Sequence, residues 1–225
     1  MSTGIEHKQI LYAVLNWGLG HAARSLPLIS HLHRKGHKLV LASSGNALNL
    51  LKKECPELRY FELPDYGVKY HSSSMTANML LSSPAILKAI YREKQITKKL
   101  TEDYKPDYII SDSRFGVYSS KVKSILISHQ LNLKTGNRLQ GTLVQKINSS
   151  WHSRFDEIWV PDVNEKLNLS GDLSHPSPYQ NTKYIGPLTR FKGSHESEKD
   201  IKYDWIIVLS GPEPAKSRFK EKLIK

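Results

Sequence analysis

The chain has 225 residues, among them 33 lysines and arginines, 21 aspartates and glutamates and one cysteine, and its formal net charge is +12. A single cysteine excludes an internal disulfide framework, so a reducing compartment and a cytoplasmic location are the simplest interpretation. No apolar run approaches the length of a membrane span, and the first residues do not read as a signal peptide.

The positive charge is concentrated in the first part of the chain. Residues 1–150 hold 21 basic and 10 acidic residues, a net charge of +11. Residues 151–225 hold 12 basic and 11 acidic residues, a net charge of +1. This imbalance predicts an anionic partner, or else it is simply a solvated basic surface. The lysines are scattered along predicted helices and do not alternate with aromatic residues, which disfavours nucleic acid. Peripheral contact with an anionic membrane, or a phospholipid-linked ligand, explains the charge better.

Short apolar runs alternate with helical patterns along most of the chain. Strands are predicted at residues 9–15, 38–42, 59–63, 108–111, 124–128 and 157–160, and helices at 25–34, 47–53, 75–103 and 139–151. Pro27 is expected in the first turn of its helix, and Ser83-Pro84 is expected to break the long third helix. The alternation predicts an α/β fold with a doubly wound, Rossmann-like parallel sheet.

The composition changes again near residues 192–202, which are polar, lack an apolar period and are expected to form a linker. Beyond them, residues 205–209 predict a strand and 215–224 a helix. One strand and one helix cannot bury their apolar faces alone, so we expect the natural protein to continue past Lys225. The predicted organisation is a first domain at 1–191, a linker at 192–202 and the beginning of a second domain at 203–225.

A glycine loop, Gly18-Leu19-Gly20, follows the first predicted strand and leads into the first helix. Glycines there permit a tight turn, and amides at a helix N-terminus favour anions. Read as a dinucleotide fingerprint, the pattern is Gly18-x-Gly20-x-x-Ala23, but residues 41–44 lack the acidic residue that would hold a ribose, so NAD is disfavoured. No Gly-Lys-Ser/Thr follows, which excludes a Walker A loop.

Several polar residues are expected at the ligand-binding edge of such a sheet. His21, next to the glycine loop, either accepts a proton from a hydroxyl group or merely packs at the turn. Asp112 ends a strand and either faces the crevice or caps a helix. Arg114 is a candidate phosphate ligand, and His129 ends the next strand. No His/Cys cluster has metal-ligand spacing, so no metal site is expected, and the missing Gly-x-Ser-x-Gly motif disfavours an α/β-hydrolase.

The loop Gly18-x-Gly20-His21, together with Arg24-Ser25-x-Pro27-Leu28, resembles the N-terminal domain of GT-B glycosyltransferases. That family includes the enzyme that adds N-acetylglucosamine to the lipid-linked precursor of peptidoglycan. Further segments similar to the family occur in the same order along the chain, namely the Pro-Asp, strand, Ser-Asp segment at 106–112 and the segments 125–130, 155–162, 184–188 and 210–214. The ordered set is more specific than any one motif.

The resemblance implies that this chain carries the acceptor-binding domain of a sugar transferase and the start of its donor-binding domain. It implies that His21 is the base or orients the acceptor hydroxyl. Asp112, from its position at the end of a strand, is a possible partner of His21. From their positions in the sequence, contacts to the acceptor or to phosphate are expected from Gly18, Gly20, Arg24, Ser25, Arg114 and His129, and contacts to the donor from Gly211 and Arg218. The implied donor is a UDP-sugar and the acceptor a carbohydrate or a lipid-linked molecule, with no metal or other cofactor.

The chain also departs from the family. Its glycine loop has fewer glycines than is common there, and most of the donor domain is absent, so this chain alone is not expected to transfer sugar efficiently. Two alternatives stay open. One is a nucleotide-sugar epimerase of the same fold, which would act with no acceptor present, and the other is a non-catalytic binding or anchoring subunit. Inversion and retention at the sugar are both compatible with the sequence.

Overall fold

The computed structural model describes residues 7–68, 75–133, 138–190, 203–209 and 215–224. Its centre is a seven-stranded parallel sheet with the strand order β3-β2-β1-β4-β5-β6-β7. The strands are β1 (Gln9–Val14), β2 (Lys38–Ser43), β3 (Arg59–Glu62), β4 (Tyr108–Asp112), β5 (Lys123–Ile127), β6 (Glu157–Val160) and β7 (Thr182–Tyr184). The α-helices are α1 (Gly20–Arg34), α2 (Gly45–Glu54), α3 (Met75–Tyr104), α4 (Arg138–His152) and α5 (Ala215–Ile224).

The order of the strands reverses between β1 and β4. From β1 the chain adds β2 and β3 on one side, and it then returns to the other side of β1 with β4 and continues outward to β7. The register places Val14 of β1 beside Asp112 of β4, so these two strands end together. Connections that leave the two ends run in opposite directions, and α/β sheets commonly bind ligands at such a reversal.

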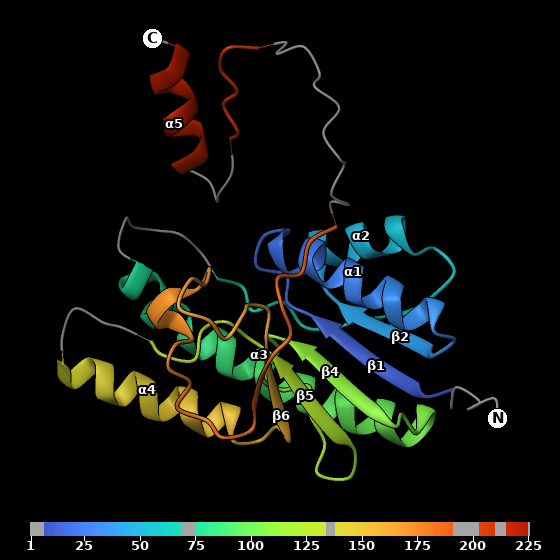
Figure 1. Ribbon diagram of the computed structural model, residues 1–225. Coiled ribbons are helices and arrows are strands. Elements are labelled where there is room, and N and C mark those ends of the chain that lie inside the picture. Colours follow the sequence, from blue (N-terminus) through green and yellow to red (C-terminus); the bar gives the residue numbers. More distant parts are fainter. Residues whose placement is uncertain (1–6, 69–74, 134–137, 191–202, 210–214, 225) are drawn as a thin grey trace.

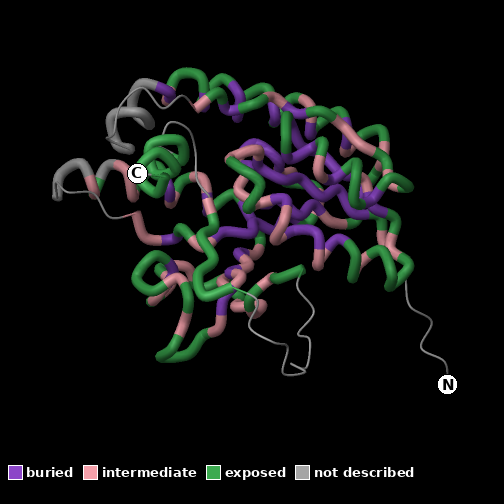
Figure 2. The backbone as a smooth tube through the Cα atoms, turned by 90° about the horizontal axis from the view of Figure 1, so that it is seen from above, coloured by how far each residue is buried: buried purple, intermediate pink, exposed green. Residues whose placement is uncertain are grey.

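Helices cover both faces of the sheet (Figure 1). One core cluster joins α1 and α2 to one face and includes Tyr12, Ile29 and Leu51. A second cluster on the opposite face includes Leu100 of α3 and Ile109. Successive residues of a strand point to opposite faces, so strands covered on both sides are apolar throughout. Figure 2 shows the buried residues concentrated along these strands, and the predicted doubly wound α/β fold is confirmed.

The six strands predicted for the first domain all form, with ends that shift by no more than a residue. β7 was not predicted, because its three residues at the sheet edge are only partly buried and give no apolar signal. The strand predicted at residues 205–209 was wrong. These residues adopt no regular structure, and Trp205 is 89% exposed. A strand needs a neighbouring strand for its backbone hydrogen bonds, and none of those described pairs with this segment.

Two expectations about proline were also wrong. α1 begins at Gly20, five residues earlier than predicted, so Pro27 lies inside the helix and not in its first turn. α3 runs through Pro84 without the predicted break. A proline removes one intrahelical hydrogen bond. Ile86 and Ile90, which follow Pro84 in the same helix, are buried in a core cluster, and this packing favours a continuous helix.

The predicted linker at 192–202 and the loop at 210–214 lie outside the described residues, so the division into two domains stays a prediction. The predicted helix at 215–224 forms as α5. Within the described part of the chain, no helix is long and apolar enough to cross a membrane.

Candidate functional site

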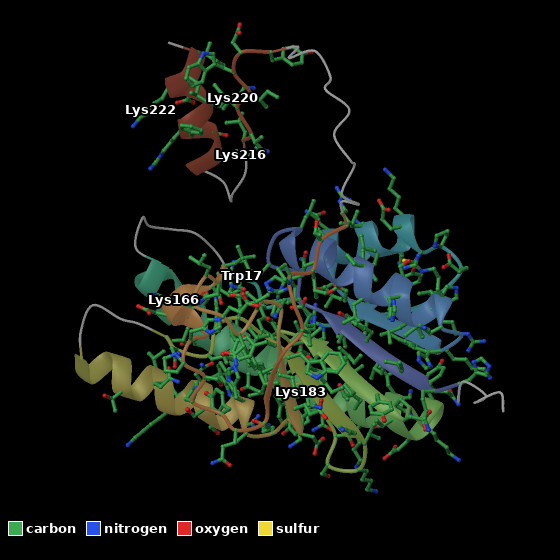
Figure 3. The ribbon with its side chains drawn as sticks, in the orientation of Figure 1. Trp17, Lys166, Lys183, Lys216, Lys220 and Lys222 are labelled. Atoms are coloured by element: carbon green, nitrogen blue, oxygen red, sulfur yellow. The ribbon has the colours of Figure 1, made fainter. Side chains whose placement is uncertain are left out.

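The loop between β1 and α1 lies at the carboxyl end of the sheet, where Figure 3 labels Trp17. Gly18 has a φ of 70°, a conformation that other residues rarely adopt, and Gly20 is the first residue of α1. A Cβ atom added to either glycine would meet no heavy atom within 4 Å, so the space above the loop is open. α1 has no side-chain cap and no acidic residue in its first turn, and its first amides therefore favour an anion or an electron-rich oxygen.

His21 and Asp112 meet at the carboxyl ends of β1 and β4. Nδ1 of His21, in the first turn of α1, lies 2.8 Å from Oδ1 of Asp112, at the end of β4. The Asp112 side chain is fully buried, whereas the His21 side chain is 17% exposed. The carboxylate therefore lies beneath the imidazole, which is the arrangement of a general base and the group that orients it.

Two further residues of α1 hold Asp112 in place. Nε of Arg24 donates to Oδ2 of Asp112 at 2.9 Å, and Nη2 of Arg24 forms an ion pair with Oδ1. The Ser25 hydroxyl donates to Oδ2 at 2.9 Å. Burial by itself would raise the pKa of Asp112, but the Arg24 charge and the hydrogen bonds from Arg24 and His21 outweigh burial and hold this pKa well below its usual value. Asp112 is therefore a carboxylate at neutral pH.

His129, which follows β5, joins the same group of side chains. Nη1 of Arg24 lies 3.0 Å from Nδ1 of His129. Burial, followed by the nearby charges of Arg24 and His21, lowers the pKa of His129 below its ordinary value. The fold thus brings together four of the predicted site residues, His21, Arg24, Asp112 and His129, from three separate elements.

Two predicted ligands are buried inside the fold. The Ser25 hydroxyl is buried beneath the site and is used by Asp112. Arg114 is fully buried, and its guanidinium donates to the Val14 carbonyl at 2.7 Å, to the Pro64 carbonyl at 2.9 Å and to Glu93 at 2.6 Å. Protein groups surround the charge of Arg114 on the inside of the fold, so its position gives no support to the expected contact with a phosphate.

A second polar cluster beside the glycine loop was missed. Nδ2 of Asn16 donates to Oδ2 of Asp65 at 2.6 Å, and the Ser44 hydroxyl donates to the same oxygen at 3.2 Å. The cluster joins the connections that follow β1, β2 and β3. Each of its members comes shortly after a predicted strand, and this shared position is the signal that would have found it.

The remaining predicted residues are less defined. Gly211 lies outside the described residues, and Arg218 is exposed on α5, so donor binding by either residue stays a prediction. Among the described residues, no group of three His, Cys, Asp or Glu side chains is placed to hold a metal ion.

The doubly wound parallel sheet, with polar side chains at the reversal between β1 and β4, is a GT-B-type fold, which solved glycosyltransferases share. Residues 8–134 match the profile of the family described as glycosyl transferase family 1. The chain belongs to this family.

Two relatives from Methanosarcina species match nearly the whole chain. An uncharacterized glycosyltransferase of Methanosarcina mazei is 26% identical over an alignment of 232 residues, which covers 90% of this chain and 56% of that protein. An uncharacterized glycosyltransferase of Methanosarcina acetivorans is also 26% identical, over 218 residues, with the same coverage. The chain therefore spans about half the length of the curated relatives that it matches.

Solved structures share the fold at low sequence identity. The calicheamicin glycosyltransferase CalG4 superposes with a TM-score of 0.55 and 13% identity, over 81% of this chain and 53% of that chain. UGT89C1 of Arabidopsis thaliana, solved with UDP-L-rhamnose, superposes with a TM-score of 0.54 and 13% identity, over 87% of this chain and 52% of that chain.

Proposed function

We propose that the whole protein transfers a sugar from a nucleotide-sugar donor to an acceptor hydroxyl, and that this chain supplies the acceptor side and the base. The observation that carries the proposal is the His21–Asp112 pair at the reversal of the sheet, 2.8 Å apart and beside an open glycine loop. Membership of glycosyl transferase family 1 supports the reaction class.

The contacts of His21 define which of its nitrogens acts as the base. Asp112 is ionised, so a proton on Nδ1 of His21 makes a hydrogen bond, whereas an unprotonated Nδ1 would place two lone pairs 2.8 Å apart. Nδ1 therefore carries the proton, and Nε2 offers its lone pair. No hydrogen bond from the described residues to Nε2 is seen.

The proposed step follows from this arrangement. The acceptor oxygen forms a bond to the anomeric carbon of the donor sugar while its hydroxyl proton passes to Nε2 of His21. The bond from the anomeric carbon to the diphosphate breaks, and the nucleotide leaves with that electron pair. Asp112 stabilises the imidazolium that results, without taking its proton.

The donor and acceptor are proposed by class. The UDP-L-rhamnose complex of UGT89C1 supports a UDP-sugar as the first donor to test. We place donor binding at Gly211, Arg218 and the sequence that would follow α5, with helix amides and basic groups stabilising the leaving diphosphate without a metal. The charge of residues 1–150 supports an anionic acceptor, such as a lipid-linked carbohydrate, and peripheral contact with an anionic membrane.

The test is turnover of UDP-sugars by the whole natural protein, with and without a panel of carbohydrate and lipid-linked acceptors. Acceptor-dependent release of UDP together with a glycosylated product, in the presence of a metal chelator, is the expected result. Conversion of the sugar without any acceptor would show an epimerase instead. Binding of acceptor without turnover of any donor would show a binding subunit. The anomeric configuration of the product distinguishes inversion from retention.

A further inference from the structure

Arg24 contacts two imidazole rings as well as the buried carboxylate. Its Nη2 atom lies 3.0 Å from Nδ1 of His21, and its Nη1 atom lies 3.0 Å from Nδ1 of His129. The two rings come from different parts of the chain, one from α1 and one from the connection after β5. Although the two distances are equal, the two contacts differ in which atom supplies the proton.

In the contact with His129, only Arg24 can be the hydrogen-bond donor. A guanidinium group carries only donors and stays protonated in proteins, and the neighbouring Asp112 raises the pKa of Arg24 further against the effect of burial. Nδ1 of His129 must therefore accept the hydrogen bond with its lone pair. A neutral imidazole with a lone pair on Nδ1 carries its proton on Nε2.

In the contact with His21, by contrast, the ring nitrogen Nδ1 is itself a donor. Nδ1 of His21 and Nη2 of Arg24 both approach the same atom, Oδ1 of Asp112. Two donors that share one acceptor lie about 3 Å from each other, so the separation of 3.0 Å between them needs no hydrogen bond of its own. His21 thus keeps its proton on Nδ1.

We propose that Arg24 is a positioning residue that holds His21 and His129 in opposite tautomers, which leaves a lone pair on Nε2 of His21 and an N–H donor on Nε2 of His129. The two ring nitrogens of an imidazole point in different directions, so the Nε2–H group of His129 is directed away from Arg24. The described residues around His129 whose charges act on it are Arg24, His21, Asp112 and Asp162.

The two tautomers predict which chemical groups a ligand of this site must carry. This prediction rests on the proposed function. One acceptor hydroxyl gives its proton to His21, while a second oxygen with a free lone pair receives a hydrogen bond from His129. A vicinal diol, or a hydroxyl group next to a phosphate oxygen, has this chemistry. Because His129 is neutral, it serves as a donor without adding charge.

The test needs no substrate, so it is independent of whether the protein transfers sugar. The chain is labelled with ¹⁵N-histidine, and long-range ¹H–¹⁵N spectra at neutral pH read the protonation of each ring nitrogen. Loss of signals in His21→Gln and His129→Gln variants assigns the two rings among the ten histidines. The expected result is a protonated Nδ1 in His21 and a protonated Nε2 in His129. The same tautomer in both rings, or a protonated Nδ1 in His129, overturns the proposal.

A pair of variants isolates the role of Arg24. Arg24→Lys keeps a charge beside Asp112, but a single ammonium cannot replace both the contact with Asp112 and the contact with His129. His129 should then shift toward a mixture of tautomers while His21 keeps its proton on Nδ1. Arg34→Lys, at the exposed end of the same helix, should leave both rings unchanged. Unchanged His129 signals in Arg24→Lys would show that Arg24 does not set this tautomer.

Discussion

Arg24 and Asp112 lie 88 residues apart in sequence and form a two-pronged contact in the fold, with Nε on Oδ2 at 2.9 Å and Nη2 on Oδ1. This contact couples α1 to the end of β4. It keeps a buried carboxylate ionised next to His21, which no neutral partner would do as well. The geometry of the proposed base therefore depends on a buried ion pair beneath His21.

Replacing Asp112 by Asn should lower kcat/KM of the whole protein by about 10²–10⁴-fold. An amide cannot hold the His21 tautomer or stabilise the imidazolium. The same variant should lose about 3–5 kcal/mol of stability, because Arg24 is left without its anion. Steady-state kinetics and urea unfolding measure the two effects.

The matched control is Asp107→Asn. Asp107 is an exposed carboxylate near the start of β4 that accepts a hydrogen bond from the Gln9 amide at 2.7 Å. It should change activity and stability little. Equal kinetic effects from the two variants would exclude a specific role for Asp112.

Asp112 should contribute to the fall in the free energy of unfolding at acidic pH. Its pKa is lower in the folded chain than in the unfolded chain, where it is about 3.9. Its stabilising effect is therefore complete above the unfolded value and is lost as the pH falls from about 4 toward the folded pKa. The difference in unfolding free energy between wild type and Asp112→Asn should be constant at pH 6–8 and shrink below about pH 4. A difference that grows with acidification would contradict the ion pair.

Replacing Arg114 by Met should destabilise the fold by about 3–5 kcal/mol, since it leaves Glu93 buried without its cation. Burial already raises the pKa of Glu93, and the Arg114 charge opposes that rise. The double variant Arg114→Met/Glu93→Leu should recover part of the loss in urea unfolding. A single-variant loss below about 1 kcal/mol would mean that the pair does not hold the sheet to α3.

Much of the fold could be predicted from the sequence, because apolar runs and their spacing depend mainly on burial against the sheet. Residues that end neighbouring strands meet at one edge, so Asp112 could be expected near His21. The contact of Arg24 with both Asp112 and His129 could not be predicted, because it depends on the rotation of α1 over the sheet.

The differences between the sequence-based predictions and the structure share a physical cause. Arg114 and Ser25 are predicted as ligands because their side chains can bind phosphate. Both side chains are buried inside the fold, which the local sequence does not show. Pro84 and β7 depend on packing with distant residues, which outweighs local propensity. The strand expected at 205–209 has the right side chains but no pairing partner among the described strands.

The glycine loop should respond to substitution according to backbone conformation. Gly18→Ala should cost about 1–2 kcal/mol, because an alanine is strained at a φ of 70° even though its Cβ atom meets nothing within 4 Å. Gly20→Ala, at the first residue of α1, should change stability by less than about 0.5 kcal/mol. Thermal unfolding of both variants measures the difference, and equal effects would contradict the strained turn.

The most direct test of the proposed function is the turnover of His21→Ala in the whole protein, compared with His31→Ala on the exposed side of the same helix. If His21 is the base, its loss should lower kcat by about 100-fold or more while His31→Ala keeps wild-type turnover. A loss of less than about threefold in His21→Ala would contradict the proposal that His21 is the base, and it would leave His21 a residue that only shapes the turn.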